Sequence, residues 1–438
     1  MSRELTTRRS FLKGTCLAGA FPTIVSPFAL GLNGSVPASD RIVMGMIGVG
    51  SMGGGHVRAF LTHADVHVAA ICDVREEHRN RAKEAVDAKY GDKACKTYSD
   101  FRELLARRDI DAVLIAVPDH WHALIGIEAA QAGKDMYYEK PMARTVAESK
   151  AARSAILRHQ VVFQFGTQQR SSYNYRFAAE LVRNGRIGEL KTIMIGSATS
   201  QFVPNQPEQP VPPGFDYEMW LGPAPWAPYT FERCTRNWTL IYDYSLGCVS
   251  GAWGIHDVDI AQWVLGTDNT GPGEVEGWGV FPKEGLYDTA TAWEVEHSYP
   301  GGVKLIHMDM RTALKKAKQF SLHWMGMLFE GTEGWIYVSR DGVHTEPASL
   351  SKVVIGPNEK QFPKSTDHRR NFLDCVRTRR QPISPIEAAV RSDTVCHQAD
   401  IAMRLKRRLR WDPVAELFVG DEQANRMLSR AMRSPWHL

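Results

Sequence analysis

The seven cysteines of this 438-residue chain lack the close spacing of metal-binding or disulfide-rich proteins. Cys16 lies near the N-terminus, and no Cys-x-x-Cys pair occurs among the six that follow it, which are Cys72, Cys95, Cys234, Cys248, Cys375 and Cys396. This spacing argues against a zinc site or a disulfide framework. We therefore expect no metal site and mostly buried free thiols, although an oxidising compartment would allow one or two bridges.

The sequence also lacks a basic cluster and a long hydrophobic run. Residues 2–38 carry a net charge of +3, so most of the chain's +4 belongs to the leader, and no Lys/Arg cluster with interleaved aromatic residues follows. A nucleic-acid partner is therefore not expected. The apolar stretch from Cys16 to Leu30 is short and interrupted by Pro22 and Pro27. It is typical of a removable signal segment, so we expect no stable membrane anchor after its removal.

The leader contains Thr7-Arg8-Arg9-Ser10-Phe11-Leu12-Lys13, which is typical of a bacterial twin-arginine signal. That route carries proteins that have already folded. We therefore predict a signal and linker over residues 1–38, cleavage near Ala38, and a periplasmic or otherwise exported protein.

Alternating strands and helices follow the leader, and 43% hydrophobic residues suffice for two domains with cores of their own. Compact apolar runs predict buried parallel strands, at 41–48, 66–72, 111–117 and 135–138. Helices are predicted between and after them, at 53–63, 75–89 and 122–132. This order predicts a doubly wound parallel sheet of the Rossmann type over residues 41–160.

The pattern changes from residue 161 to longer, alternating runs, at 191–197, 292–299, 303–310 and 334–339. They predict an α+β domain over residues 161–410 with a large, open, mostly antiparallel sheet and helices on one face. Residues 384–408 are predicted to be helical. Residues 201–238, rich in proline and aromatic residues, are predicted to form a long loop without regular structure near the site. The tail, residues 411–438, shows no core of its own.

A dinucleotide-binding fingerprint ends the first predicted strand. Gly48-Val49-Gly50-Ser51-Met52-Gly53 opens a helix, and Asp73 follows the second strand 20 residues later. The glycines let backbone N–H groups, including those of Ser51 and Met52, approach the pyrophosphate, and the Asp73 carboxylate can accept hydrogen bonds from the ribose. Asp73 would repel a 2′-phosphate, which favours NAD over NADP. Arg75 weakens that preference, because its guanidinium could reach such a phosphate.

Two further motifs end predicted strands, namely Val117-Pro118-Asp119-His120-Trp121-His122 and Glu139-Lys140-Pro141. With them, residues 41–410 resemble the glucose–fructose oxidoreductase / inositol dehydrogenase / rhizopine catabolism (Gfo/Idh/MocA) family. The resemblance implies that Lys140 lies beside the nicotinamide and the substrate hydroxyl. It also implies that Pro118, His122 and Glu139 line the cofactor site. A lysine at a strand's carboxyl end would in any case face the ligand crevice of such a sheet.

The stretch from Gly254 to Trp263 is similar to the family's segment that carries a catalytic histidine. The resemblance makes His256 the acid/base, a role that suits an imidazole, and adds Asp259 three residues later. The chain departs from the family at Ala252, where an aspartate would stand four residues before the histidine. We expect Ala252 to lie one helical turn before His256. If His256 is structural, Asp243, Tyr244 and Asp259 are the next candidate bases.

The stretch Gly166-Thr167-Gln168-Gln169-Arg170 resembles the family segment that lines the substrate pocket. On this basis Gln169, Arg170 and Tyr173 are predicted to bind a polyhydroxylated ligand. Trp238 is a candidate apolar platform for a sugar face, with a place in the core as the alternative.

These observations predict an exported NAD-dependent oxidoreductase that acts on a sugar, glycoside or cyclic polyol. Because free NAD is not expected outside the cytoplasm, the cofactor should be tightly held. Two alternatives stay open. One is a redox-neutral enzyme that cleaves glycosides or epimerises sugars through a keto-sugar, and the other is a non-catalytic NAD- or sugar-binding protein. The family resemblance also implies a homo-oligomer.

Overall fold

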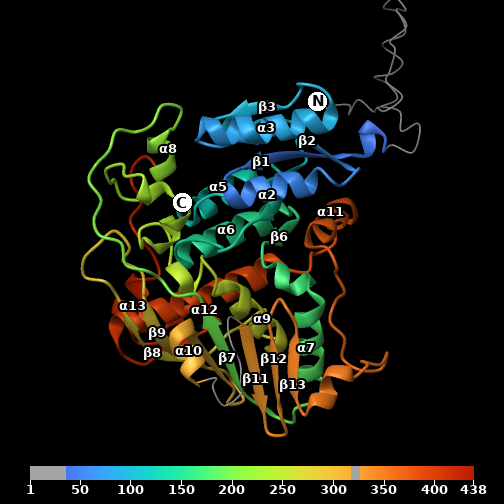
Figure 1. Ribbon diagram of the computed structural model, residues 1–438, viewed down its shortest axis with the longest axis vertical. Coiled ribbons are helices and arrows are strands. Elements are labelled where there is room, and N and C mark those ends of the chain that lie inside the picture. The colour runs from blue at the N-terminus through green and yellow to red at the C-terminus, as the bar shows by residue number, and fades with distance from the viewer. Residues whose placement is uncertain (1–35, 317–325) are drawn as a thin grey trace, which may run out of the picture. The chain divides into compact units, whose positions relative to one another are not determined.

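The computed structural model describes residues 36–316 and 326–438, and residues 42–438 form one unit within it (Figure 1). The predicted leader, including Arg8, Arg9 and Cys16, lies outside the described residues apart from residues 36–38. The six other cysteines are free thiols. In the described ranges, no helix is long and apolar enough to cross a membrane.

The first sheet has six parallel strands in the order β3-β2-β1-β4-β5-β6. Ile47, the last residue of β1, pairs with Cys72 of β2 and Ile115 of β4, so these strands end at the same edge. The strands are β1 Ile42–Ile47, β2 Val66–Cys72, β3 Lys96–Tyr98, β4 Ala112–Ile115, β5 Asp135–Tyr138 and β6 Phe163–Phe165. Of these, β3 and β6 have too few residues for a pattern to predict, and β6 lies beyond residue 160.

Helices cover both faces of this sheet, which explains its continuous apolar strands. Side chains of α2 and α3 pack with Met44, Met46 and Val68 on one face. Side chains of α4, α5 and α6 pack with Ile47 and Ile115 on the other. The helices are α2 Ser51–Phe60, α3 Glu76–Tyr90, α4 Phe101–Leu105, α5 Asp119–Gln131 and α6 Val146–His159.

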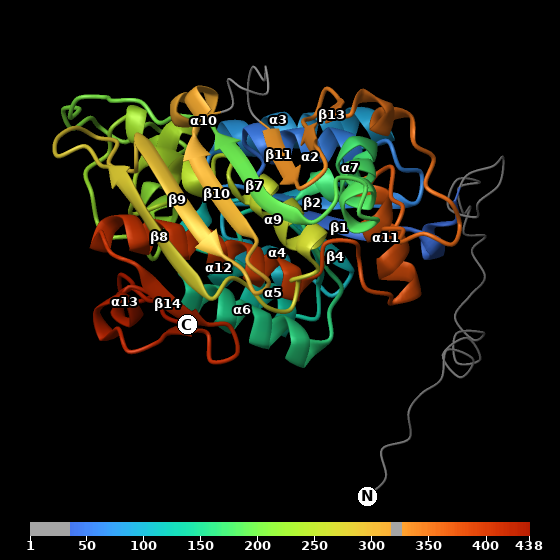
Figure 2. The ribbon, with the colours of Figure 1, turned by 90° about the horizontal axis from the view of Figure 1, so that it is seen from below.

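The second sheet has nine strands in the order β13-β12-β11-β7-β10-β9-β8-β14-β15. Its pairs are antiparallel except for β7 with β10, so the predicted mostly antiparallel sheet is confirmed. The strands are β7 Leu190–Ser197, β8 Glu274–Val280, β9 Ala292–Ser298, β10 Lys304–Asp309, β11 Gly326–Gly331, β12 Trp335–Val338, β13 Val343–Glu346, β14 Leu409–Asp412 and β15 Leu417–Phe418. Helices α7 Tyr173–Arg183, α9 Ile255–Leu265 and α12 Ile386–Leu405 pack against it, behind the strands that face the viewer in Figure 2.

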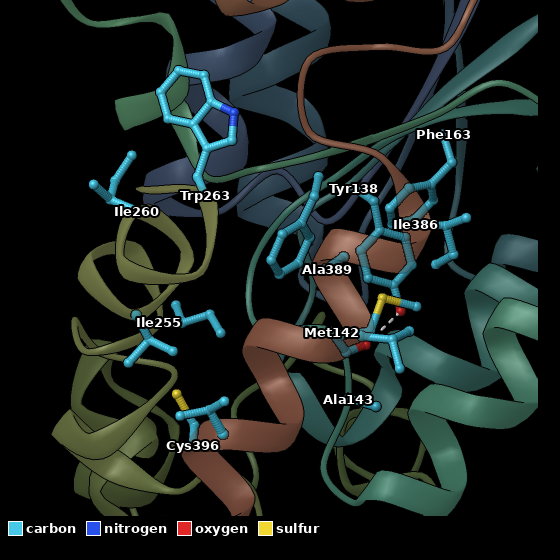
Figure 3. Packing of buried hydrophobic residues seen from close by; sticks show 14 of the residues in the cluster. Tyr138, Met142, Ala143, Phe163, Ile255, Ile260, Trp263, Ile386, Ala389 and Cys396 are labelled. Atoms are coloured by element: carbon cyan, nitrogen blue, oxygen red, sulfur yellow. Dashed lines mark hydrogen bonds between the residues drawn. The ribbon is translucent and has the colours of Figure 1, made fainter. Parts of the chain in front are cut away.

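Helix α12 joins the two domains, because it is buried along nearly its whole length between them. Figure 3 shows Ala389 of α12 between two groups of side chains, with Ile386 beside the first group and Cys396 beside the second. Tyr138, Met142, Ala143 and Phe163 of the first domain lie on one side, and Ile255, Ile260 and Trp263 of α9 lie on the other. The loop after β5 is therefore held against the second domain by a shared core.

The 201–238 segment differs in part from the expectation drawn from the sequence. Residues 201–238 are mostly irregular but contain the short helix α8, Tyr217–Leu221, so the prediction of no regular structure there is wrong in part. Asp216 starts α8 by accepting a hydrogen bond from the Met219 N–H. The tail adds β14, β15 and α13 (Glu422–Arg426), and its Trp411 and Phe418 pack into the core of the second domain.

Candidate active site

The glycine turn after β1 leaves no room for side chains. Gly48 has φ +78°, and a Cβ there would lie 2.4 Å from the carbonyl oxygen of Ala116. A Cβ on Gly53 would lie 1.9 Å from the carbonyl oxygen of Gly48. The turn thus packs directly against β4, and α2 begins at Ser51 with Gly50 at its N-cap and no side-chain cap. The first N–H groups of α2 are left for an anion such as a pyrophosphate.

Asp73 follows β2 and is fixed beside this turn. Its carboxylate accepts hydrogen bonds from the backbone N–H of Val49, at 2.8 Å, and of Arg75, at 2.9 Å. The guanidinium of Arg75 lies 3.8 Å over the ring of Phe215 and donates to the Cys234 carbonyl. Arg75 therefore points to the 201–238 segment and not to a ribose phosphate. It gives no reason to expect NADP in place of NAD.

His122 ties together the loops after β4 and β5. Its Nε2 lies 2.9 Å from the Val117 carbonyl oxygen, and its Nδ1 contacts the Pro141 carbonyl oxygen. Burial lowers the pKa of His122 to about 4. Pro118 is the N-cap of α5 in the same loop. Because both ring nitrogens face backbone carbonyls, His122 positions the cofactor loops and has no nitrogen free for the cofactor itself.

Glu139 is held at the end of β5 by Gln168 of the 166–170 stretch and by two residues that no sequence motif indicated, His56 and Arg369. Arg369, near the start of α11 (His368–Thr378), donates from Nε to His56 Nδ1 at 3.0 Å. An arginine is always a donor, so His56 carries its proton on Nε2 and donates to Glu139 at 2.8 Å. Gln168 donates to the same carboxylate oxygen at 2.8 Å. Burial would raise the pKa of Glu139, but His56, Lys140 and His256 outweigh it and hold the pKa at about 2.

Lys140 and His256 come from different domains and face the same carboxylate. Lys140 Nζ donates to the carbonyl oxygen of Gly251 at 2.7 Å. His256 is the second residue of α9, is 5% exposed, and has no hydrogen-bond partner for Nδ1 within the described chain. Burial first, and then the charges of Lys140 and Arg340, lower the pKa of His256 to about 3, while Glu139 raises it. The imidazole is therefore neutral near pH 7.

Ala252 does not lie one helical turn before His256 on a common helix, so that expectation is wrong. Helix α9 begins at Ile255, and residues 251–254 form a turn in which the Ala252 N–H donates to the Gly247 carbonyl. The turn arises because Gly254 packs against the Val249 carbonyl and the His307 ring, where a Cβ would collide.

Arg170 and Asp259 bind each other instead of facing the crevice. Two bonds of 2.7 and 2.8 Å join the guanidinium to the carboxylate, and Asp268 accepts from Arg170 as well. The Arg170 and Asp259 side chains are 1% and 0% exposed. Burial alone would lower the pKa of Arg170, but Asp259 and Asp268 raise it above its usual value. This geometry supports a structural role for the pair in place of the predicted roles in substrate binding and catalysis.

The other predicted substrate residues are spread over different environments. Gln169 is 3% exposed, and neither of its amide atoms has a hydrogen-bond partner in the described ranges. Tyr173 is 64% exposed and stacks on Phe177 at the surface. Trp238 is partly buried against the core of the 201–238 segment. Of the three, Gln169 has the free polar atoms that a buried ligand site requires.

Asp257 is a polar residue next to His256 that sequence reasoning missed, and Trp253 adds an aromatic ring beside the imidazole. Trp253 Nε1 donates to Asp257 Oδ2 at 2.9 Å, while Oδ1 is buried and, within residues 36–316 and 326–438, unpartnered. Burial raises the pKa of Asp257 to about 7. The Arg340 guanidinium lies 4.6 Å over the Trp253 ring. Asp257 follows the motif histidine directly, but nothing in the motif distinguishes it from a solvent-facing residue.

No group of three or more His, Cys, Asp and Glu side chains in the described part of the chain is placed to hold a metal ion. The residues present fit a dinucleotide instead. An uncapped helix terminus, a glycine turn and an acidic residue after β2 lie together at the carboxyl edge of the sheet, the usual place for such a ligand.

Comparison with known proteins agrees with this geometry. Residues 42–167 match the oxidoreductase family model for the NAD-binding Rossmann fold, and residues 190–438 match the model for the family's C-terminal alpha/beta domain. An uncharacterized oxidoreductase, YrbE of Bacillus subtilis, is 28% identical over 232 residues, or 53% of this chain and 56% of that protein. A glycosyl hydrolase family 109 protein of Shewanella baltica is 37% identical over 161 residues, or 32% of this chain and 35% of that protein. The chain thus spans about a third to a half of these relatives.

Solved structures share the fold at low identity. The WlbA dehydrogenase of Bordetella pertussis, in complex with NADH and UDP-GlcNAcA, has a TM-score of 0.61 at 17% identity, over 85% of this chain and 99% of that one. A levoglucosan dehydrogenase in complex with NADH and levoglucosan has a TM-score of 0.62 at 18% identity, over 84% and 99%. Two family models together match most of the chain, so the chain belongs to the Gfo/Idh/MocA oxidoreductase family, with an NAD-binding Rossmann domain followed by the family's C-terminal α/β domain.

Proposed function

We propose that this protein is an NAD-dependent oxidoreductase that acts on a sugar, a glycoside or a cyclic polyol. One observation carries the proposal. Lys140 Nζ, from the first domain, donates at 2.7 Å to the Gly251 carbonyl in the turn that leads into α9, whose second residue is His256, and Lys140 and Glu139 both shift the pKa of this imidazole. An acid/base group and a cation at this edge suit removal of a hydroxyl proton and stabilisation of the oxygen's developing charge.

In the proposed reaction the protein accepts the proton of the substrate hydroxyl group, and the cofactor accepts the hydride. NAD, bound at the glycine turn, supplies the acceptor for the hydride. The His256 imidazole accepts the hydroxyl proton, and the negative charge of Glu139 favours the imidazolium that results. The Lys140 ammonium donates a hydrogen bond to the substrate oxygen and stabilises its partial negative charge. The chain Arg369–His56–Glu139 holds the carboxylate in place during this step.

A polyhydroxylated substrate fits the unpartnered polar atoms near His256. Asp257 has a free carboxyl oxygen within the described residues, and Trp253 has an aromatic face beside the His256 ring. Buried polar atoms without partners are uncommon in proteins, and hydroxyl groups of a ligand would satisfy these. The sugar ligands of the two dehydrogenases named above support the same class of substrate.

A second candidate function is redox-neutral cleavage of a glycoside. It is supported by the relatives named glycosyl hydrolase family 109 protein and, in Shewanella oneidensis, alpha-N-acetylgalactosaminidase, both 37% identical to part of this chain. Oxidation of a ring hydroxyl to a ketone would acidify the neighbouring C–H. Loss of its proton would then expel the glycosidic group, which leaves as an alcohol. Water would add to the resulting double bond, and the hydride would return to the ketone. Such an enzyme releases an alcohol from a glycoside without accumulating NADH.

Absorbance at the NADH band, with a panel of sugars, glycosides and polyols, tests these functions on the full chain. We expect His256→Ala to lower turnover by roughly 10²- to 10⁴-fold and Lys140→Met to do comparable damage, with NAD binding unchanged in both. His159→Ala and Lys191→Met change exposed residues and are the matched controls. If the wild-type protein binds NAD yet neither reduces it nor cleaves any member of the panel, the non-catalytic alternative holds.

We also propose that the protein is exported with its cofactor already bound and that it forms homo-oligomers. The twin-arginine motif supports export, and the lack of an external NAD pool supports tight binding. Replacing Arg8 and Arg9 with lysines should leave the precursor in the cytoplasm, and normal export of that variant would refute the signal. Nucleotide absorbance should survive extensive dialysis of the purified protein, and light scattering should give a mass above 49.1 kDa.

A further inference from the structure

Asp119 is a buried carboxylate that the proposed reaction does not use. It is the first residue of α5 and is 3% exposed, and a hydrogen bond with the Ser245 side chain lowers its pKa. The groups that face it are the Ser245 hydroxyl, the cations of Lys140 and Arg144, and the carboxylate of Asp393. A carboxylate placed so deeply needs a reason, because burial of a charge is costly.

Gly251 connects Asp119 to Lys140. A Cβ on Gly251 would lie 2.3 Å from Asp119 Oδ2 and 2.6 Å from the Ser245 hydroxyl, so only a residue without a side chain fits there. The carbonyl oxygen of the same Gly251 accepts the hydrogen bond from Lys140 Nζ at 2.7 Å. Asp119 and Lys140 therefore both contact one residue, and this residue belongs to the turn that leads into α9 and His256.

We infer that Asp119 is a positioning residue for the proposed reaction, and that its carboxylate, packed against Gly251, supplies the negative charge that holds the Lys140 ammonium at the site. The inference rests on the proposed function. An acidic group is thus present although Ala252 stands where the family has an aspartate, because Asp119 comes from the start of α5 in the other domain. Asp119 packs against the turn that accepts the Lys140 hydrogen bond, so it acts through Lys140.

The charge on Asp119 changes near neutral pH. Burial raises the pKa of Asp119 to about 7, although Ser245 and Lys140 lower it. The carboxylate is therefore ionised mainly above pH 7, and its hold on Lys140 strengthens as the pH rises through that value. Asp257 provides a matched comparison, because burial raises its pKa to about 7 as well, but the cation that faces it is Arg340.

Infrared difference spectroscopy of the full-length, NAD-loaded protein tests the pairing without any substrate. The protonated carboxyl band of Asp119 is identified by its loss in Asp119→Asn. If Asp119→Asn does not fold, Asp257→Asn identifies the band instead. The carboxyl band that still titrates near pH 7 in that variant belongs to Asp119. Lys140→Met should move its midpoint upward by about one pH unit, because a nearby cation favours the carboxylate. Arg340→Met should move the Asp257 midpoint and leave that of Asp119 in place.

A second measurement reads the effect on Lys140 itself. Acetic anhydride is added at pH 8, and mass spectrometry follows acetylation of Lys140. Asp119→Asn should make Lys140 react about tenfold faster, because the side chain is then no longer held against the Gly251 turn and is more accessible to the reagent. Asp257→Asn and the exposed Lys191 serve as controls that should not respond.

Unchanged acetylation of Lys140 in Asp119→Asn, or an Asp119 midpoint that ignores Lys140→Met, overturns the inference. These outcomes are separate from those of the proposed function. If both measurements respond but no sugar, glycoside or polyol reacts, the proposed function fails and the pairing stands. If turnover depends on Lys140 and His256 while neither measurement responds, the function stands and Asp119 is only a packed residue.

Discussion

Replacing Asp259 with asparagine separates a structural role from a catalytic one. The change keeps the shape of the side chain and removes the charge that pairs with Arg170. If the pair is structural, as its geometry indicates, Asp259→Asn should destabilise the fold. If Asp259 is catalytic, as the sequence motif indicated, the variant should lose turnover and keep its stability.

The expected loss of stability follows from the burial of the pair. Arg170 and Asp259 are 1% and 0% exposed and are joined by bonds of 2.7 and 2.8 Å. Breaking a buried pair from one side costs about 3–5 kcal/mol, because the other charge is left uncompensated. Asp268 still contacts Arg170 in the variant. We therefore expect the lower end of that range, about 3 kcal/mol of unfolding free energy.

Urea denaturation of the full chain at pH 7, followed by tryptophan fluorescence, measures this change. Asp268→Asn is the matched control. Its side chain is 30% exposed, so its loss should cost less than about 1 kcal/mol. The double variant Arg170→Met/Asp259→Leu removes both charges and should recover most of the stability lost in Asp259→Asn. An unchanged unfolding free energy in Asp259→Asn, together with a turnover at least a hundredfold lower, would refute the structural role.

Three further predictions concern the cofactor site and the response to pH. Asp73→Ser should raise the Kd for NAD more than the Kd for NADP in a fluorescence titration, because NAD loses ribose hydrogen bonds while NADP loses a repulsion; equal effects would place the ribose elsewhere. Gly53→Ala should abolish NAD retention or folding, because the new Cβ would lie 1.9 Å from the Gly48 carbonyl oxygen. Gly55→Ala is the control: its Cβ would have no atom within 4 Å, and the change should stabilise α2 by about 0.5–1 kcal/mol. The free energy of unfolding should fall as the pH drops below about 6.5, because the folded protein then binds fewer protons than the unfolded one. The reason is that burial lowers the pKa of six histidines in the described chain to about 3 or 4. They are His120, His122, His256, His297, His307 and His368. Asp119 and Asp257, with raised pKa values near 7, oppose this trend. The prediction is contradicted if the urea concentration at the unfolding midpoint does not decrease when the pH is lowered from 7 to 5.

Local sequence patterns were enough to predict the fold class and the cofactor. A buried parallel strand is an uninterrupted apolar run, and β2 and β5 have the predicted bounds, Val66–Cys72 and Asp135–Tyr138. Two glycines of the fingerprint are required by close contacts, Gly48 with Ala116 after β4 and Gly53 with the Gly48 carbonyl, and their spacing indicates the turn. Short elements such as β3 and β6, with three residues each, have no periodicity to detect.

The family resemblance named Lys140 and His256, and the structure joins Lys140 by a hydrogen bond to the turn that leads into α9 and His256. The resemblance could not show that Arg170 and Asp259, 89 residues apart, neutralise each other. Nor could it show that Arg369 reaches His56 across 313 residues of chain.

The sequence by itself therefore determined the order of elements, the NAD-binding turn and the pair of groups proposed for catalysis, because each depends on neighbouring residues or on a motif. The tertiary structure decided which buried polar groups are free to act and which are neutralised. That distinction depends on partners brought together from distant elements, such as Asp119 and Gly251. A buried charge or amide must find a partner wherever the fold provides one, and no local pattern in the chain records which partner that is.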